Sequence, residues 1–215
     1  MLVKIIKESG TDKYSHGYAP VYQEYLSHLK DEKFQLCDIG VLKGNSLKAW
    51  NKYFTNADIH GFDLMRFPKV GNIPVHKMDQ CSKEEMTALV KELKLKPTII
   101  VEDGGHKPEH HQKTIYPFFK AMKSGGIYFI EDLQVCFHGK KPINTKYEVT
   151  PENNTIDWLK ALLTETPMKS PYLTAKEQKY LIDNIESIDF RTNGKLAIIR
   201  RNENISNRRS RLCRN

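Results

Sequence analysis

The stretch FQLCDIGVLKGNSLKAW, residues 34–50, decides the fold. Its first six residues form a short apolar run that ends in Asp-Ile-Gly, which is typical of a buried strand followed by a turn. Residues 45–54 then show the apolar spacing of a helix, and Asn45 or Ser46 can cap its first turn. The stretch therefore predicts a strand, a glycine-containing turn and a helix.

The same alternation continues on both sides of this stretch. Further strands are predicted at residues 59–63, 73–78, 98–101 and 127–130, and further helices at residues 19–29, 82–93, 108–122 and 156–163. Strands that alternate with helices through short connections are typical of a parallel sheet with helices on both faces. Near the end of the chain, two strand-like runs at residues 185–190 and 195–200 flank Thr-Asn-Gly, which predicts an antiparallel hairpin.

The turn after the first predicted strand carries the pattern D-x-G-x-x-x-G-x-S, formed by Asp38, Gly40, Gly44 and Ser46. Glycines let the backbone approach a ligand closely, and a helix N-terminus offers free N–H groups. The spacing differs from the G-x-G-x-x-G of NAD enzymes and from a P-loop. The pattern is compatible with a cofactor site, and also with an ordinary glycine turn of an α/β protein.

Two more polar strand ends indicate which ligand this edge of the sheet would bind. Asp63 ends the second predicted strand, about 20 residues after the glycine loop, where an acid can accept hydrogen bonds from ribose hydroxyls. Asp79 and Gln80 end the third, beside which an adenine would lie. Because no pyrophosphate-binding loop is evident, these features favour S-adenosylmethionine (SAM) over NAD. The alternative is that Asp63 only caps a helix.

Three carboxylates are predicted to meet at the ends of two neighbouring strands. Asp103 ends one strand, and Glu131 and Asp132 end another. Neighbouring strands lie about 4.8 Å apart, so these groups would repel one another unless a cation lay between them. Oxygen ligands select a hard ion, Mg²⁺ or Mn²⁺. The alternative is three solvated acids at strand ends.

His106 lies beside these acids and is predicted to accept a proton. A rival interpretation places His106, Glu109, His110 and His111 in a zinc site. The spacing disfavours zinc, because Pro108 is expected to begin a helix and His110 and His111 would then point about 100° apart. A loop histidine without a chemical role is the remaining alternative.

The net charge of the 215 residues is +8, a value that could indicate a nucleic-acid ligand. Six of the eight arginines lie in residues 200–215, so residues 1–199 carry only +3. We expect residues 202–215 to form a basic, disordered tail. Nucleic acid is not the expected partner, because no aromatic residues are interleaved with these arginines for base stacking.

Cysteine usage and hydropathy give the expected compartment. Cys37, Cys81, Cys136 and Cys213 are widely separated and form no C-x-x-C motif, which favours free thiols in a reducing compartment. The chain has no run of about 18 apolar residues for a membrane span, and the apolar run at its N-terminus is too short for a secretory signal. We therefore expect a cytoplasmic protein without a membrane span.

Taken together in order, the motifs resemble those of the macrocin O-methyltransferase family. They are G-T-D-K-x-x-H-G-Y (residues 10–18), D-I-G-V-x-x-G-x-S (38–46), G-F-D (61–63), D-Q (79–80), E-D-G-G-H (102–106) and G-G-x-Y-x-I-E-D-L (125–133). The resemblance implies a Rossmann-like class I methyltransferase fold. Its sheet would be mostly parallel and seven-stranded, with an antiparallel C-terminal hairpin and helices on both faces.

The resemblance also assigns roles to residues. Asp103, Glu131 and Asp132 would hold Mg²⁺ (or Mn²⁺), and His106 would be the general base, with Asp103 beside it in catalysis. The residues expected to bind SAM are Lys13, His16, Tyr18, Asp38, Gly40, Gly44, Ser46, Asp63, Asp79 and Gln80. The implied reaction is O-methylation of a sugar hydroxyl, whose proton His106 removes as the oxygen attacks the SAM methyl group.

The acceptor would be a free sugar, a nucleotide-linked sugar or a glycan or glycoside. One departure is Gly105, where the family usually has serine. The longer members carry an extra N-terminal domain, so this chain is expected to be the catalytic domain only. Within it, residues 1–201 would form one domain, with residues 1–33 over the cofactor and residues 133–182 over the acceptor. A homo-oligomer is compatible with this organisation.

Three other functions stay open at this point. A catechol-type or other small-molecule O-methyltransferase also uses Mg²⁺ and strand-end acids, but typically has Asp-Asn where this chain has Glu131-Asp132. A nucleic-acid methyltransferase or binder would explain the basic tail. A non-catalytic interaction protein with the SAM-binding fold is the third, and the complete set of acids with His106 argues against it.

Overall fold

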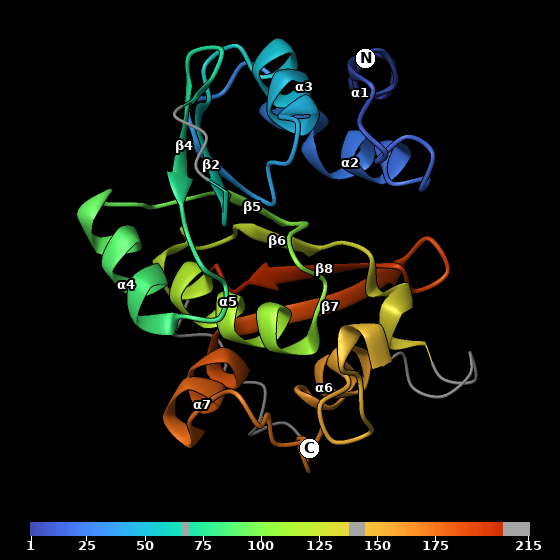
Figure 1. The fold of residues 1–215 in the computed structure, drawn as a ribbon, viewed down its shortest axis with the longest axis vertical. Coiled ribbons are helices and arrows are strands. Elements are labelled where there is room, and N and C mark those ends of the chain that lie inside the picture. Colours follow the sequence, from blue (N-terminus) through green and yellow to red (C-terminus); the bar gives the residue numbers. More distant parts are fainter. Residues whose placement is uncertain (66–68, 138–144, 204–215) are drawn as a thin grey trace.

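The structure, a computed structural model, describes residues 1–65, 69–137 and 145–203. Its strands form a sheet in the order β3-β4-β2-β1-β5-β6-β8-β7. Their bounds are β1 Gln35–Ile39, β2 Asp58–Asp63, β3 Lys69–Val70, β4 Ile73–Lys77, β5 Ile99–Glu102, β6 Ile127–Ile130, β7 Ile185–Arg191 and β8 Leu196–Arg201. Figure 1 shows the sheet running through the middle of the molecule.

The class I methyltransferase fold predicted from the sequence is confirmed. Strands β4, β2, β1, β5 and β6 run parallel, while β8 is antiparallel to β6 and pairs with β7 in the predicted C-terminal hairpin. The sheet has eight strands where seven were expected. The additional one, β3, has only two residues and pairs antiparallel with β4, which is too short to leave a periodic signal.

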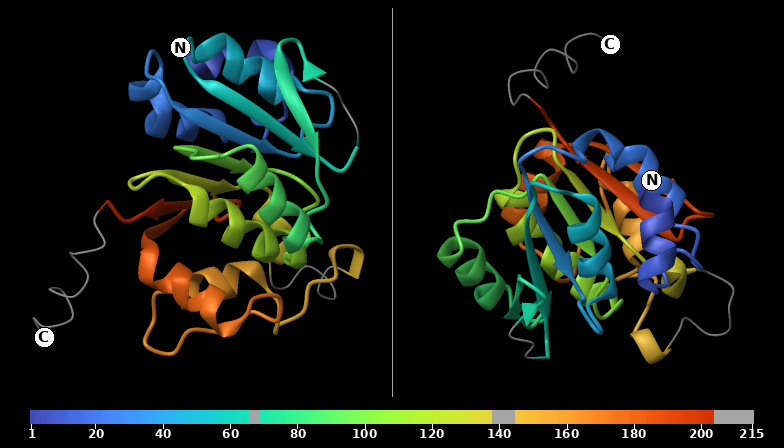
Figure 2. Two further views of the ribbon diagram at one scale, coloured as in Figure 1. Left: turned by 90° about the vertical axis from the view of Figure 1, so that its left-hand side faces the viewer. Right: turned by 90° about the horizontal axis from the view of Figure 1, so that it is seen from above.

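Helices cover both faces of the sheet, as expected. Their bounds are α1 Leu2–Ser9, α2 Ala19–Leu26, α3 Asn45–Tyr53, α4 Lys83–Glu92, α5 Pro108–Ala121, α6 Thr155–Ala161 and α7 Ala175–Asn184. Buried side chains of α1, α2 and α3 pack with one face of the sheet, and those of α4 to α7 belong to the core on the other face. Figures 1 and 2 show the blue N-terminal helices and the orange α6 and α7 on opposite sides of the sheet.

Helices α1 and α7 were not predicted from the sequence. Helix α1 buries Leu2 and Ile6, which lie four residues apart, and ends at Gly10 in a left-handed conformation with φ 72°. Helix α7 has a capping box, in which Thr174 accepts from the Glu177 backbone N–H. These signals were present but short, and short amphipathic helices carry few periodic positions.

Local side-chain and backbone chemistry explains where helices α4 and α5 begin. Ser82 accepts from the Glu85 backbone N–H at the start of α4, and Pro108 is the first residue of α5, as the sequence indicated.

None of the described helices is long and apolar enough to cross a membrane. Most of the predicted tail, residues 204–215, lies outside the described residues. The divisions at residues 1–33 and 133–182 stay predictions.

Candidate functional site

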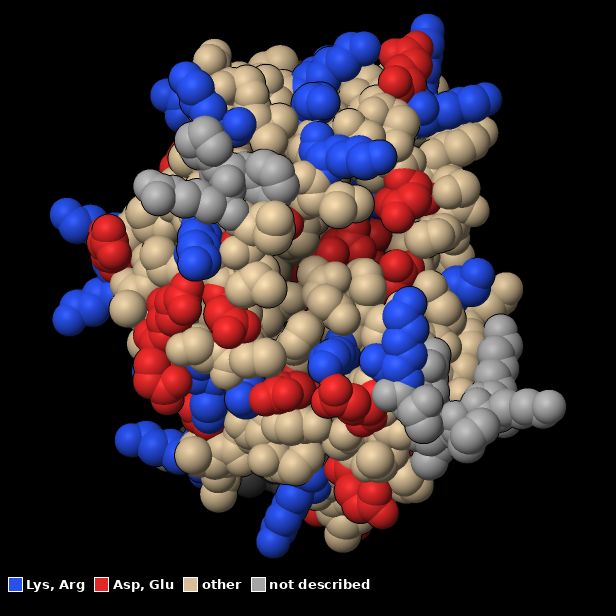
Figure 3. All heavy atoms as spheres, viewed as in Figure 1, with Lys and Arg blue, Asp and Glu red and all other residues tan. Residues whose placement is uncertain are grey.

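A cavity of about 800 Å³ opens at the carboxyl ends of the parallel strands. Its wall consists of residues 10–12, the loop between β1 and α3, the ends of β2 and β4, and the loop between β5 and α5. Figure 3 shows a hollow on this side of the molecule with acidic side chains at its floor. This is the edge of an open α/β sheet where ligands bind.

Gly40 lets two strand-end loops come together at this edge. Its φ of 94° is left-handed, and a Cβ there would lie 2.0 Å from the carbonyl oxygen of Asp103. Only glycine meets both conditions, so this residue brings the β1 loop against the β5 loop. Gly44, also predicted to bind the cofactor, is instead the N-cap of α3 with φ 73° and does not line the cavity.

Asp63 lines the cavity at the end of β2 and holds its wall in place. One carboxylate oxygen accepts from the backbone N–H groups of Val41, at 2.9 Å, and Leu42, at 3.0 Å. The other accepts from the N–H of Met65 at 2.8 Å. The oxygen that accepts from Met65 can accept one further bond, so Asp63 keeps capacity for a ligand.

Asp38, which is predicted to bind the cofactor, is not among the residues that line the cavity. It is fully buried, and one oxygen accepts from Ser46 Oγ at 2.6 Å and from the Trp50 indole at 3.2 Å. Burial raises the pKa of Asp38 to about 6, while the charge of Lys13 and the bond from Ser46 act the other way. Ser46 itself does line the cavity.

Asp79 and Gln80 line the cavity at the end of β4, as predicted. Asp79 Oδ1 accepts from the Cys81 N–H at 2.8 Å. The Gln80 amide is held on both sides, because its nitrogen donates to Glu102 at 2.6 Å and its oxygen accepts from the Gly105 N–H at 2.9 Å. Gln80 therefore ties the end of β4 to the loop after β5.

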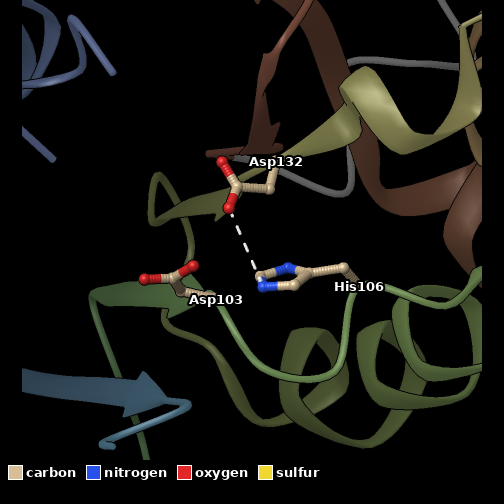
Figure 4. A group of neighbouring side chains, drawn as sticks. All are labelled: Asp103, His106 and Asp132. Carbon is tan, nitrogen blue, oxygen red and sulfur yellow. Dashed lines mark ion pairs between the residues drawn. The ribbon is translucent and has the colours of Figure 1, made fainter. Parts of the chain in front are cut away.

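Asp103, His106 and Asp132 come together at the carboxyl ends of β5 and β6 (Figure 4). One ligand atom from each residue lies within 4.8 Å of the others, and His106 Nε2 is 3.7 Å from Asp132 Oδ2. His106 and Asp132 both have φ 57°, a left-handed conformation that is costly outside glycine. Strain of this kind is concentrated at functional sites.

Glu131 does not join this group in the structure, although it was predicted to be a metal ligand. Its buried carboxylate accepts a hydrogen bond from the Tyr22 hydroxyl and lies 2.9 Å from the Lys13 ammonium. The same ammonium is 2.5 Å from Asp103 Oδ2. Asp132 has a left-handed backbone conformation and does not continue strand β6, so its side chain and that of Glu131 reach different partners. Glu131 and Asp103 thus share one cation supplied by the chain.

The N-terminal segment contacts the acids through Lys13, His16 and Tyr18, the three residues of this segment that are predicted to bind SAM. Lys13, His16 and Tyr18 do not line the cavity, which is instead bounded on this side by residues 10–12. His16 Nδ1 lies 3.2 Å from Asp132 Oδ1, and the Tyr18 hydroxyl donates to the same oxygen at 2.7 Å. The segment packs against the acidic strand ends because Lys13 supplies a cation, and His16 and Tyr18 supply polar partners, for carboxylates that would otherwise be buried without them.

The electrostatics differ among the three carboxyl groups. Burial raises the pKa of Asp103, and the adjacent Lys13 ammonium only partly offsets this. Burial and the charge of Asp103 raise the pKa of Glu131 well above its ordinary value. Asp132 is the opposite case: burial acts to raise its pKa, but hydrogen bonds from Tyr18 and Gln134 and the nearby histidines hold it below its ordinary value. Asp132 is therefore the most firmly ionised of the three.

The zinc interpretation of the histidines is not supported by their positions. His111 is fully buried, with Nε2 3.4 Å from Glu102 Oε2 and Nδ1 3.4 Å from Thr155 Oγ1. His110 lines the cavity, and neither it nor His111 joins a metal-type group within the described ranges. The Glu102–His111 pair was missed from the sequence, and burial raises the pKa of Glu102 to about 7.

Tyr22 is another contact that sequence reasoning missed. It follows Tyr18 by four residues, so both lie on one face of the same helical turn and reach Asp132 and Glu131. This spacing was a usable signal. Gln134, which donates to Asp132 Oδ1 at 3.1 Å, had no such signal, because it lies in a short 3₁₀ helix.

Comparison with known proteins finds that the chain is similar to sugar O-methyltransferases. The chain is 29% identical over 149 residues to an 8-demethyl-8-(2-methoxy-alpha-L-rhamnosyl)-tetracenomycin-C 3'-O-methyltransferase of Streptomyces olivaceus, a match of 63% of this chain and 37% of that protein. It is 26% identical over 141 residues to an 8-demethyl-8-alpha-L-rhamnosyl tetracenomycin-C 2'-O-methyltransferase of the same organism. This match covers 60% of this chain and 36% of that protein. No protein-family model matches the chain.

Among solved structures, the chain is similar to a methyltransferase of the mycinamycin biosynthetic pathway in complex with Mg, S-adenosylhomocysteine (SAH) and mycinamycin VI. The TM-score is 0.75 at 19% identity, over 96% of this chain and 56% of that one. At this identity the likeness establishes the fold. The chain spans little more than a third of the length of the curated relatives it matches. The resemblance to macrocin-type sugar O-methyltransferases is confirmed by these relatives.

Proposed function

We propose that this chain, a homologue of the macrocin-type enzymes, transfers the methyl group of SAM to a sugar hydroxyl with the help of Mg²⁺ or Mn²⁺. The observation that carries the proposal is the position of Asp103, His106 and Asp132 beside a cavity that Asp63 and Asp79 line. A proton acceptor and a cation-binding pair thus adjoin a pocket with the polar groups that a nucleoside needs.

The cofactor would lie along the strand ends in the cavity. Gly40 leaves room for its backbone approach, Asp63 offers free acceptor capacity to ribose hydroxyls, and Asp79 lies on the next strand, where the base would be. The cavity volume of about 800 Å³ is within the range of 300–1,000 Å³ that is usual for small-molecule sites. Gly10, Thr11 and Asp12 would close the cofactor on the other side.

The donor set fits a hard divalent cation. Asp103 and Asp132 supply carboxylate oxygens within 4.8 Å of each other, and Glu131 adds negative charge that Lys13 shares with Asp103. Asp103 and Glu131 share the single charge of Lys13, and Asp132 adds a third carboxylate, which leaves an excess of negative charge that attracts a cation. Asp103 and Asp132 would hold the ion, and Glu131, which contacts Tyr22 and Lys13, would contribute negative charge nearby.

When bound, SAM supplies an electrophilic methyl group, and the divalent ion lowers the pKa of a hydroxyl near it. His106 takes the hydroxyl proton at Nε2, the nitrogen that faces Asp132. The O–H bond breaks, the new O–CH₃ bond forms, and the S–CH₃ bond breaks to leave SAH. Asp132 and Asp103 stabilise the imidazolium that results. Holding both substrates in line supplies much of the remaining acceleration.

An assay across acceptor classes tests this function. The protein, SAM and Mg²⁺ are incubated with free sugars, nucleotide sugars, glycosides, a catechol and an RNA duplex, and SAH release is measured. We expect turnover with at least one sugar-containing acceptor and a methyl ether on a sugar oxygen in the product. Turnover with the catechol or the RNA alone would contradict the proposal and favour one of the other acceptor classes.

A further inference from the structure

Two adjacent glycines in the loop after β5 leave space for side chains from elsewhere. A Cβ on Gly104 would lie 2.1 Å from Gln80 Oε1, and a Cβ on Gly105 would lie 1.9 Å from His110 Nδ1. Neither glycine has a positive φ, so the backbone conformation does not require glycine here. The requirement is steric: each glycine makes room for one side chain.

Both of these side chains belong to the wall of the cavity. Gln80 follows β4, and His110 lies in the first turn of α5. They lie there with Met78 and Cys81, which also line the cavity. The absence of side chains at residues 104 and 105 therefore shapes the part of the wall beside the end of β4.

This part of the wall faces the base of the proposed cofactor. Strand β2 ends in Asp63, which would accept from the ribose, and β4 is the next strand outward in the sheet. The base lies beyond the ribose, so it falls at the end of β4, next to the ring of His110. An aromatic ring at this place can stack on or bond to a purine.

The state of His110 is suited to an uncharged partner. Its Nδ1 is buried and has no hydrogen-bond partner among the described residues. Burial lowers the pKa of His110, and the nearby Lys107 ammonium lowers it further. A neutral imidazole can approach a neutral purine without the cost of burying a charge.

We propose that His110 contacts the purine base of SAM and that Gly105 lacks a side chain in order to admit the imidazole ring to the cavity. This inference rests on the proposed function, because it uses the position of the cofactor. It adds a residue to the cofactor site and gives a physical reason for glycine at position 105, where a serine side chain would collide with the ring.

A double-mutant cycle with SAH as the probe tests the pairing. Dissociation constants are measured by calorimetry for the wild type, Gly105→Ala, His110→Ala and the double variant. We expect each single variant to bind SAH about tenfold more weakly, which is about 1.4 kcal/mol, because each would lose the contact between the base and the ring. We expect the double variant to bind like His110→Ala. The alanine methyl group at position 105 weakens binding only by displacing the His110 ring, and the double variant lacks that ring.

Gly104→Ala is the matched control, because its Cβ would meet Gln80 and not His110. The change in SAH affinity that Gly104→Ala causes should be the same with and without His110→Ala. Adenosine is the second probe, and His110→Ala should weaken adenosine and SAH by the same factor. If Gly105→Ala does not fold, His110→Phe keeps the ring and should bind SAH within about twofold of the wild type.

Additive effects of Gly105→Ala and His110→Ala would overturn the inference, as would a loss confined to SAH, which would place the contact on the amino-acid part of the ligand. Failure of the proposed function looks different. It would appear in the acceptor assay as no methylation of a sugar-containing acceptor, whereas the double-mutant cycle measures SAH binding alone.

Discussion

Replacing His106 with alanine is expected to lower the rate of methyl transfer by about 10²–10⁴-fold, the usual contribution of a positioned general base. His106 Nε2 faces Asp132 at 3.7 Å, and alanine leaves no group there to take the hydroxyl proton. SAH affinity should stay within about twofold of the wild type, because His106 acts on the acceptor hydroxyl. The measurement is SAH release under saturating SAM, alongside calorimetric SAH binding.

Two further variants control this experiment. His106→Asn removes the base but tolerates the left-handed backbone of this position, so it should lose as much activity as His106→Ala with less loss of stability. His28→Ala removes an exposed histidine from the far end of the N-terminal segment and should leave the rate unchanged. A fully active His106→Asn enzyme would show that another group takes the proton.

Replacing Lys13 with methionine is expected to destabilise the protein by about 3–5 kcal/mol, the usual cost of removing one partner from a buried ion pair. The ammonium is fully buried and lies 2.5 Å from Asp103 and 2.9 Å from Glu131. Methionine preserves the apolar stem but leaves two buried carboxylates without a cation. Urea denaturation at neutral pH measures the loss of unfolding free energy.

The pH dependence of this variant gives a second, independent measurement. Burial raises the pKa of Asp103 and Glu131 in the folded state, so the native protein binds more protons than the unfolded chain. Stability of Lys13→Met should therefore fall as pH rises from the ordinary value of 4.5 for Glu131 towards its raised folded value. Mg²⁺ should raise the melting temperature of this variant more than that of the wild type, since it supplies the missing charge.

Lys52→Met is a control for this second prediction, because Lys52 forms an exposed ion pair with Glu8 at 3.1 Å. Exposed pairs contribute little, so its stability should change by less than about 1 kcal/mol. A Lys13→Met protein as stable as the wild type, with the same pH profile, would show that Lys13 does not neutralise the strand-end acids.

The alternation of strands and helices along the chain and the edge of the sheet that carries the site could be predicted from the sequence. The strand at residues 34–39 ends in a glycine turn, and later apolar runs end in Asp63, Asp79 and Asp103, which fixes the carboxyl edge as the polar one. These signals are local, because each depends on residues close together in the chain. The structure confirms the fold that they indicated.

The distribution of contacts among the acids could not be predicted in the same way. The sequence placed Glu131 with Asp103 and Asp132, but it gave no sign that Lys13, about 90 residues before Asp103, would lie between two of them. The direction of a side chain after the end of a strand depends on backbone angles such as the left-handed φ of Asp132. Those angles are set by packing of distant segments.

The contact between Gly105 and His110 in the cavity wall could not be predicted from the sequence either. In the sequence, Gly105 was only a departure from the serine that the macrocin-type family usually has. The structure gives a steric reason for glycine, because the ring of His110 fills the place of a side chain. That contact joins the loop after β5 to the first turn of α5, and no spacing rule predicts which atoms will meet across it.

Methyl transfer to a sugar hydroxyl is proposed to need a divalent ion, and a chelation experiment tests this requirement. The protein is treated with excess EDTA, and SAH release with the best sugar acceptor is measured before and after Mg²⁺ is restored. We expect loss of turnover in EDTA and recovery on addition of Mg²⁺ or Mn²⁺, with Asp103 and Asp132 holding the ion. Full turnover in excess EDTA would contradict it.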